Sequence, residues 1–299
     1  MYCARLGVRV VDAVKVLLMV KPSPASFARE GRSKGYFSYE VPEFKWELIS
    51  LGNTFRAPTS TWREFDVLIQ EDGGNWGTYV GDMPKVFIAF DSTLSDRHYE
   101  VRLNHSKQFN LVLIDHDRLE RFPGSRRFSY CVNDKVFFDR GLDRDIDVSF
   151  HCASSGPGDG TRTKVRKLLG KWSEASGITY TSGVRGLDEY TENMTRSKII
   201  VNWPRVPINR PFRVFDAMAS GACLVTGTLP EVGGEEKVSG RDFIEVADHR
   251  DLPRVCGELL ESGRWKEIAT NGYKLVMEKH TWAVRAKELR ELLKGGLGI

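Results

Sequence analysis

Short apolar runs alternate with segments of helical periodicity along most of the chain. Each run is rich in Val, Ile, Leu or Phe and is bounded by polar or turn residues, which is typical of parallel strands buried on both faces. The runs are 14–20, 65–71, 85–91, 110–115, 145–152, 178–181, 198–203, 223–227 and 243–247. The alternation predicts an α/β fold with parallel sheets.

The segments between these runs predict helices. The clearest lies in the second half, where Val165, Leu168, Leu169 and Trp172 recur at i, i+3, i+4 and i+7 and so share one helical face. Three helices are expected after residue 251. Other helices are expected at 41–51, 96–108, 186–197 and 211–220.

A charged loop at 133–144 divides the chain into two halves of alternating strands and helices. A length of 299 residues suits two domains. We expect an N-terminal Rossmann-like domain at 1–140, a C-terminal one at 141–280 and a final helix at 281–299. Parallel sheets bind ligands at the carboxyl ends of their strands, so two facing domains favour a nucleotide or sugar between them.

Composition narrows the class of ligand. The net charge of +4 is a mild excess that fits a small anionic ligand and lacks the dense basic stripe typical of nucleic-acid binding. The five cysteines include no CxxC pair, which favours reduced thiols over disulfides or a zinc site. The N-terminal apolar run is too short to span a bilayer, and we expect a cytoplasmic protein.

The segment 198–231 carries the most chemical information. It predicts a strand, a loop, a helix with Pro211 in its first turn, and a second strand. The helix is mostly apolar, yet Arg213, Asp216 and Ser220 fall on one face. Buried charges are costly unless they are paired or contact a ligand, so either an internal Arg213–Asp216 ion pair or a ligand site is expected.

In the ligand hypothesis, the helix N-terminus and Arg213 meet a diphosphate. Asp216 accepts hydrogen bonds from ribose hydroxyls, and Gly221 ends the helix and permits close approach of the backbone. Arg162 follows a glycine-rich loop and either contacts the diphosphate or lies on a solvated helix face. The other predicted donor-binding residues are Asn209 and Arg210, which precede Pro211, together with Ser220 and Thr226.

A candidate catalytic residue lies in the first half. Asp91 ends the predicted strand 85–91, at an edge that faces the expected cleft. A carboxylate there could act as general base for an acceptor hydroxyl. It could equally cap the helix that follows. We expect no metal site.

The pattern R-x-F-D-A-M-A-x-G-x-x-L-V-T at 213–226 resembles the C-terminal domain of the group 1 glycosyltransferases, in particular the CgeB-like branch. The likeness continues in Pro-Glu at 230–231 and in H-T-x-x-x-R at 280–285. The resemblance implies a GT-B fold, with two Rossmann-like domains facing a cleft and a C-terminal helix crossing back to the first. It also implies a donor bound by the C-terminal domain and an acceptor bound by the N-terminal one.

The resemblance further implies a retaining, metal-independent hexosyltransferase that uses a UDP- or GDP-linked sugar and no cofactor. The acceptor stays open among polysaccharide, protein, metabolite and modified DNA base, and the basic loop 118–127 suits a polyanionic one. Many group 1 members carry an acidic residue eight positions before Asp216, where this chain has Ile208. A GT-B nucleotide-sugar epimerase and a non-catalytic nucleotide-sugar-binding protein are therefore alternatives.

Overall fold

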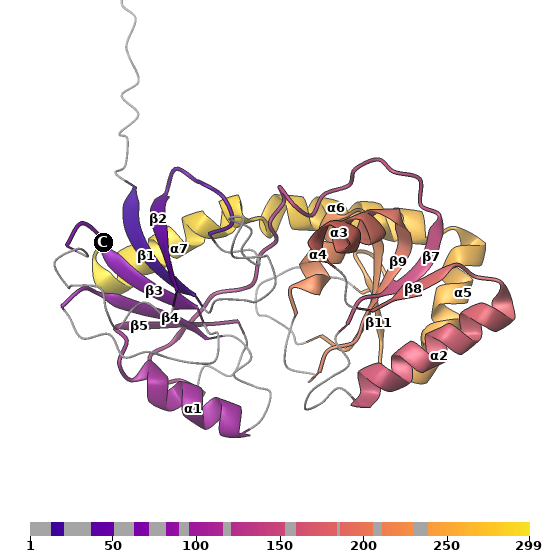
Figure 1. The fold of residues 1–299 in the computed structure, drawn as a ribbon, viewed down its shortest axis with the longest axis horizontal. Coiled ribbons are helices and arrows are strands. Elements are labelled where there is room, and N and C mark those ends of the chain that lie inside the picture. The colour runs from indigo at the N-terminus through magenta and orange to yellow at the C-terminus, as the bar shows by residue number, and fades with distance from the viewer. Residues whose placement is uncertain are drawn as a thin grey trace, which may run out of the picture.

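The two halves of the chain form two α/β domains that lie side by side (Figure 1). Each contains one sheet of parallel strands, which confirms the predicted fold class. The computed structural model describes all residues except 1–12, 21–36, 51–62, 72–81, 90–95, 116–120, 153–159, 184–185, 206–210 and 230–238.

The first sheet has the strand order β2-β1-β3-β4-β5-β6. Its faces alternate along β4, since Phe87 packs towards α1 whereas Val86 and Ile88 pack in the core that contains Leu289 and Leu293 of α7. The sheet is therefore covered by α1 (Asp96–Ser106) on one face and by α7 (Trp282–Leu297) on the other. The strands are β1 (Val14–Val20), β2 (Phe44–Ser50), β3 (Val67–Glu71), β4 (Lys85–Ala89), β5 (Leu111–Ile114) and β6 (Arg126–Arg127).

The helix predicted at 41–51 is wrong, because this segment forms the edge strand β2. Phe44 is fully buried and Trp46 half-buried, whereas Lys45 and Glu47, which alternate with them, are exposed. This alternation has the period of a strand with one solvated face. Parallel pairing with β1 buries Phe44 in the core, and the charged side chains remain in solvent.

The second sheet has the strand order β11-β10-β9-β7-β8. One of its faces packs on α2 and α5, and the other packs on α4. The strands are β7 (Ile146–Phe150), β8 (Tyr180–Ser182), β9 (Ser197–Asn202), β10 (Cys223–Gly227) and β11 (Ile244–Val246). The helices are α2 (Gly160–Ser176), α3 (Leu187–Arg196), α4 (Arg213–Ala219), the short 3-10 helix His249–Asp251, α5 (Leu252–Ser262) and α6 (Trp265–Lys279).

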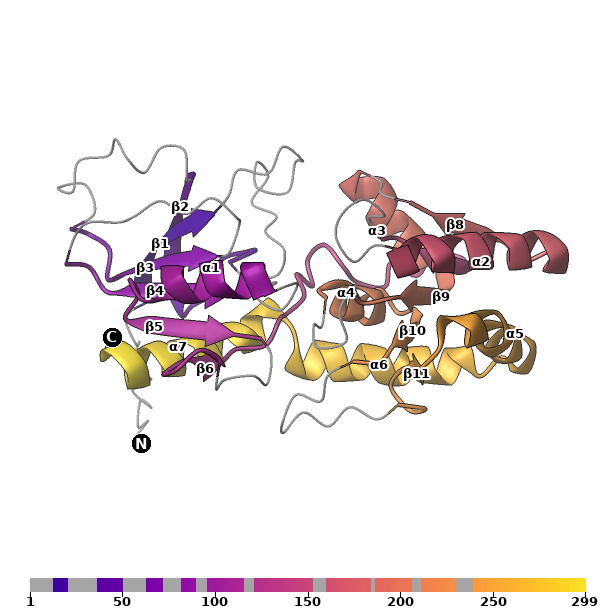
Figure 2. The ribbon, with the colours of Figure 1, turned by 90° about the horizontal axis from the view of Figure 1, so that it is seen from below.

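The chain passes between the domains twice, and the two passages are hydrogen-bonded to each other. The amide of Val132, on the outgoing passage, donates to the carbonyl of His280 at 2.8 Å. The carbonyl of Val132 accepts from the amide of Trp282 at 3.0 Å. The chain then continues as α7 along the first domain, so α6 and α7 form a yellow band beneath both domains (Figure 2). The expected return of the C-terminal helix is therefore observed.

The H-T-x-x-x-R pattern lies at this return passage. The hydroxyl of Thr281 accepts from the amide of Val284 and so caps the first turn of α7. The guanidinium of Arg285, one turn later, donates to Nδ1 of His280 at 2.9 Å. The pattern therefore stabilises the first turn of α7 and joins it to the end of α6.

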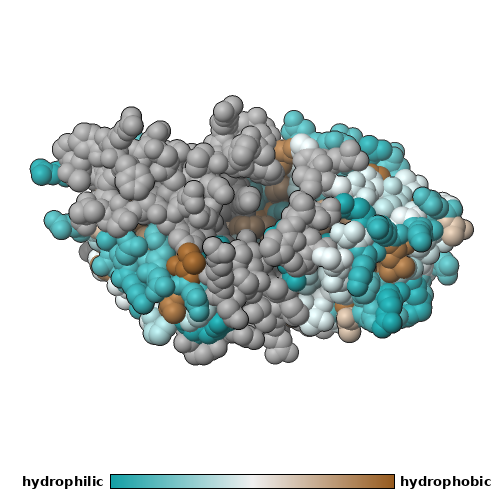
Figure 3. Space-filling model, turned by 60° about the horizontal axis from the view of Figure 1, so that its bottom comes forward, coloured by the Kyte–Doolittle hydropathy of each residue, from teal (hydrophilic) through white to brown (hydrophobic). Residues whose placement is uncertain are grey.

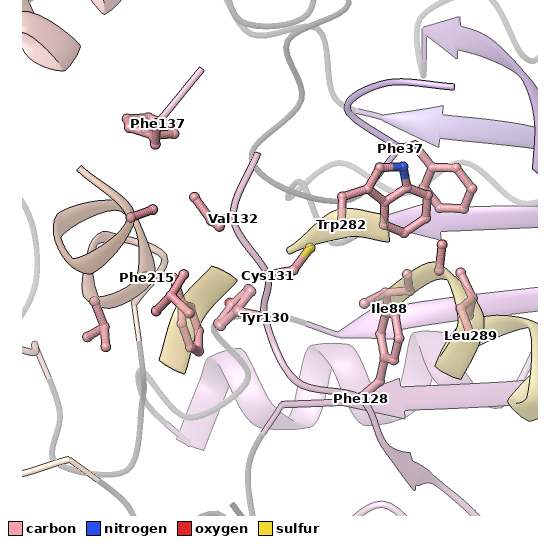
Figure 4. Packing of buried hydrophobic residues seen from close by; sticks show 14 of the residues in the cluster. Phe37, Ile88, Phe128, Tyr130, Cys131, Val132, Phe137, Phe215, Trp282 and Leu289 are labelled. Carbon is pink, nitrogen blue, oxygen red and sulfur yellow. The ribbon is translucent and has the colours of Figure 1, made fainter. Parts of the chain in front are cut away.

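One hydrophobic core extends through the passage from one domain to the other. Tyr130, Cys131 and Val132 lie between Phe215 of the second domain and Trp282 at the start of α7 (Figure 4). Trp282 is fully buried, with its ring 4.8 Å from that of Phe37. Among the described residues, no helix is long and apolar enough to cross a membrane.

Candidate donor-binding site

Polar side chains gather where strands of the second sheet end. Asn202 is the last residue of β9, Thr226 lies near the end of β10, and Cys152 follows β7. Arg213, the first residue of α4, contacts two members of this group, Cys152 and Asn202. Figure 3 shows the surface hollowed between the two domains, with hydrophobic residues at the bottom of the hollow. The carboxyl ends of parallel strands are the usual place for a ligand in such a fold.

Arg213 is held by neutral acceptors. Its Nη1 donates to Sγ of Cys152 at 3.1 Å and to Oδ1 of Asn202 at 3.3 Å. Tyr190 in α3 lies close enough to act on the charge of Arg213. Burial opposes the charged form of Arg213, but Cys152, Tyr190 and Asp216 outweigh it and raise its pKa. The guanidinium therefore stays protonated.

Within the described part of the chain, Arg213 makes no ion pair. The expected alternative of an Arg213–Asp216 ion pair is therefore not observed, although the two residues lie one turn apart in α4. The Nε atom of Arg213 is buried and has no hydrogen-bond partner among the described residues. The guanidinium as a whole is half-buried and forms no ion pair among the described residues, although Asp216 acts on its charge, so an anionic ligand would give it a direct partner.

Asp216 supplies the negative charge of the site. It is 8% exposed and lies on the same helix as Arg213. Burial raises the pKa of Tyr190, with Arg213 lowering and Asp216 raising it further, so both charged groups act on this phenol. The structure thus brings Arg213, Asp216 and Tyr190 together.

Thr226 reaches Arg213 only through Asn202. Nδ2 of Asn202 donates to Oγ1 of Thr226 at 3.0 Å, and Oγ1 donates to the carbonyl of Gly227 at 3.0 Å. Asn202 and Thr226 are both fully buried. The polar group therefore continues behind Arg213 into the sheet.

Ser220 and Gly221 lie at the far end of α4. The hydroxyl of Ser220 donates to the carbonyl of Asp216 at 2.9 Å, inside the helix. Gly221 follows with a φ of +71°, and a Cβ there would lie 2.5 Å from Oδ2 of Asp139. Asp139 and Arg144 form an ion pair at 3.1 Å, so the group that approaches this glycine closely belongs to the linker.

Arg162 lies in the first turn of α2 and is 7% exposed. Its Nε donates to the carbonyl of Trp203 at 2.8 Å, which ties α2 to the loop after β9. The helix predicted at 211–220 begins at Arg213, two residues later than expected. Asp91, Ile208, Asn209 and Arg210 lie outside the described residues.

Three residues of the site, Cys152, Tyr190 and Asn202, were not among the site residues predicted from the sequence. Asn202 carried a signal, because asparagine is depleted in strands and here it lies inside the predicted strand 198–203. Cys152 and Tyr190 carried none, since a cysteine after a strand and a tyrosine in a helix are ordinary core residues.

Comparison with known proteins identifies the family. Residues 136–291, slightly more than half of the chain, match the family model described as "Glycosyl transferase-like". The chain belongs to this family. The match includes α4 and every described residue of the site. No match was found among curated proteins. Membership of the CgeB-like branch stays a prediction.

Solved structures of glycosyltransferases share the family's two-domain GT-B fold. HepE from Anabaena, determined with UDP and glucose, is 13% identical with a TM-score of 0.62, over 94% of this chain and 100% of that one. Sucrose-phosphate synthase from Thermosynechococcus elongatus is 10% identical with a TM-score of 0.62, over 94% and 98%. A glycosyltransferase from Rickettsia africae is 10% identical with a TM-score of 0.58, over 96% and 99%.

Proposed function

We propose that this chain is a glycosyltransferase that binds a UDP-linked sugar at Arg213 and Asp216 and transfers the sugar to an acceptor hydroxyl. The observation that carries the proposal is the half-buried guanidinium of Arg213, which forms no ion pair among the described residues and whose buried Nε has no hydrogen-bond partner there. A diphosphate would pair with this guanidinium directly. The complexes of HepE with UDP and with UDP-glucose support uracil as the base.

In the proposed reaction, the bond between the anomeric carbon and the diphosphate oxygen breaks, and the acceptor oxygen bonds to that carbon. The acceptor proton passes to a base, for which Asp91 stays the candidate. Arg213 stabilises the charge that develops on the leaving diphosphate. We propose that protein groups, without a metal, meet this charge and that the anomeric configuration is retained.

The remaining assignments are part of the same proposal. Asp216 binds the ribose hydroxyls, and the acceptor is polyanionic, as the basic loop 118–127 suggests. The cysteines that the structure describes are unpaired thiols, which supports a reducing, cytoplasmic location. Other donor contacts are proposed for Arg162, Asn209, Arg210, Ser220 and Gly221, whereas Thr226 contributes to donor binding through Asn202.

The test is a titration of the purified chain with UDP, GDP and ADP, followed by thermal unfolding and calorimetry. A ligand that binds only the folded state raises the melting temperature, and we expect UDP to have the largest effect. Arg213→Met keeps the length of the side chain but removes its charge, and we expect it to abolish the UDP shift. UDP release from UDP-glucose then tests catalysis. The proposal fails if no nucleoside diphosphate binds, or if Arg213→Met binds UDP as tightly as the wild type.

A further inference from the structure

A series of hydrogen bonds through the side chains of Asn202 and Thr226 connects Arg213 to the second sheet. Nη1 of Arg213 donates to Oδ1 of Asn202 at 3.3 Å, and Nδ2 of Asn202 donates to Oγ1 of Thr226 at 3.0 Å. Oγ1 of Thr226 donates its own proton to the carbonyl of Gly227 at 3.0 Å. Asn202 and Thr226 are direct partners across the parallel pair β9–β10, so the two strands hold them in register.

Each hydrogen bond in this series fixes the donor–acceptor direction of the next. A guanidinium can only donate, so the amide of Asn202 must turn its oxygen towards Arg213. Its NH₂ group then faces Thr226, whose oxygen can accept because its proton is given to Gly227. The amide therefore has one orientation that satisfies both of its neighbours.

The amide also has a property that a carboxylate of the same shape lacks. Asparagine binds the guanidinium without neutralising it, whereas aspartate at this position would form a buried ion pair with Arg213. A paired guanidinium attracts a diphosphate less strongly, because part of its field is cancelled. The neutral partner thus leaves the charge of Arg213 available to a ligand.

We propose that Asn202 is a positioning residue for the donor site: with Thr226 behind it, it holds the guanidinium of Arg213 in place and leaves its charge for the diphosphate of the donor. This inference rests on the proposed function. It assigns a role to a residue that contacts Arg213 and is itself fully buried.

The decisive variant is Asn202→Asp, which keeps the shape of the side chain and replaces the neutral partner with a charged one. UDP and uridine are the probes, since they differ only in the diphosphate. We expect Asn202→Asp to bind UDP at least about tenfold more weakly, with unchanged affinity for uridine. A merely structural defect would weaken both ligands together, so the ratio of the two affinities reports on the charge at Arg213.

A second set of variants changes Thr226, at the other end of the hydrogen-bond series. These variants test the positioning role of Asn202 even if Asn202→Asp does not fold. Thr226→Val removes the acceptor for Nδ2 of Asn202, and Thr226→Ser keeps it. Thr195→Val is the matched control, because Thr195 is equally buried and its hydroxyl donates to a main-chain carbonyl at 3.1 Å in α3. We expect Thr226→Val to lose UDP affinity relative to uridine, Thr226→Ser to restore it, and Thr195→Val to match the wild type.

The outcomes separate the two proposals. If the wild type binds no nucleoside diphosphate, the proposed function fails and the positioning role fails with it. If the wild type binds UDP and the folded Asn202→Asp variant binds it with equal affinity, only the positioning role is overturned. If Asn202→Asp does not fold, wild-type UDP affinity in Thr226→Val overturns it. A loss shared equally by UDP and uridine also overturns it.

Discussion

The indole nitrogen of Trp282 donates a hydrogen bond to the main-chain carbonyl of Tyr39, 2.9 Å away. Trp282 begins the final helix, whereas Tyr39 precedes β2 in the first domain. The phenol of Tyr39 donates to Oδ1 of Asp134 at 2.5 Å and accepts from the amide of Ala283 at 3.2 Å. The first domain, the outgoing passage and the return passage therefore meet at one point.

Truncation of Trp282 should weaken this junction severely. Its ring is fully buried and stacks 6.1 Å from Phe44, and its polar nitrogen is satisfied by Tyr39. We expect Trp282→Ala to lower the free energy of unfolding by about 3–5 kcal/mol, measured by urea denaturation. Trp265→Ala is the control, since Trp265 begins α6 and is only half-buried. An equal loss in the two variants would contradict the assigned role of Trp282.

Gly221 should tolerate no side chain, for two separable reasons. Its φ of +71° strains any residue with a Cβ, and that Cβ would lie 2.6 Å from Nη2 of Arg144. Gly263 is the matched control, because it also ends a helix, with a φ of +69°, and has open space around its Cβ position. We expect Gly263→Ala to cost about 1–2 kcal/mol of folding stability from strain alone.

Gly221→Ala should cost measurably more than its control, because Arg144 cannot move away cheaply. Arg144 donates to the carbonyls of Thr195 and Ser197, each at 2.7 Å, and to that of Ser220 at 2.9 Å. These bonds join the linker to the ends of α3 and α4. Chemical denaturation of both alanine variants measures the difference. Equal losses of folding stability would show that the side chain of Arg144 moves aside at little cost.

The strands could be predicted from the sequence because each is a compact apolar run whose burial depends on its own residues. There are two exceptions. The strand β2 has charged residues on one face, and its pairing with β1 decided its structure. The strand β6 consists of two arginines and is defined by its pairing with β5. At the site, Arg213 and Asp216 could be predicted together because one helix places them on one face. Cys152, Tyr190 and Asn202 come from other elements, and only the sheet order β9-β7 and the packing of α3 bring them to Arg213.

His105 should make the stability of the first domain depend on pH. Its ring packs 5.1 Å from Phe87, and burial lowers its pKa from an ordinary 6.5 to about 4. Its ring nitrogens face Oε1 of Gln70 and Nε2 of Gln108, each at 3.3 Å. This arrangement suits the neutral tautomer with the proton on Nε2, because a proton on Nδ1 would face the NH₂ group of Gln108.

The direction of the pH effect follows from the lowered pKa. As the pH falls below about 6.5, the unfolded chain binds a proton at His105 and the folded chain does not, so stability declines until about pH 4. We expect urea midpoints of the wild type to fall between pH 7 and pH 5. His105→Gln keeps a neutral hydrogen-bonding side chain and should show a flatter profile. Parallel profiles for the two proteins would argue against this role of His105.

Asp216 should recognise the ribose of the donor rather than its phosphates. A carboxylate accepts hydrogen bonds from the ribose hydroxyls, so we expect the wild type to bind UDP more tightly than 2′-deoxy-UDP or 3′-deoxy-UDP. Asp216→Asn keeps the shape of the side chain but accepts more weakly. It should therefore lose affinity for UDP and lose most of the preference for whichever hydroxyl the wild type recognises.

A thermodynamic cycle compares the wild type and Asp216→Asn, each titrated with UDP and with the deoxy analogue. It isolates the contact between Asp216 and the missing hydroxyl. If they touch, removing both should cost less than the sum of the two separate losses, since each change removes the same hydrogen bond. Strictly additive losses for both hydroxyls would place the ribose elsewhere. Because Asp216 also acts on Tyr190, the cycle includes Tyr190→Phe, which we expect to keep the preference for UDP. A preference that vanished in Tyr190→Phe but survived in Asp216→Asn would transfer the role to the phenol.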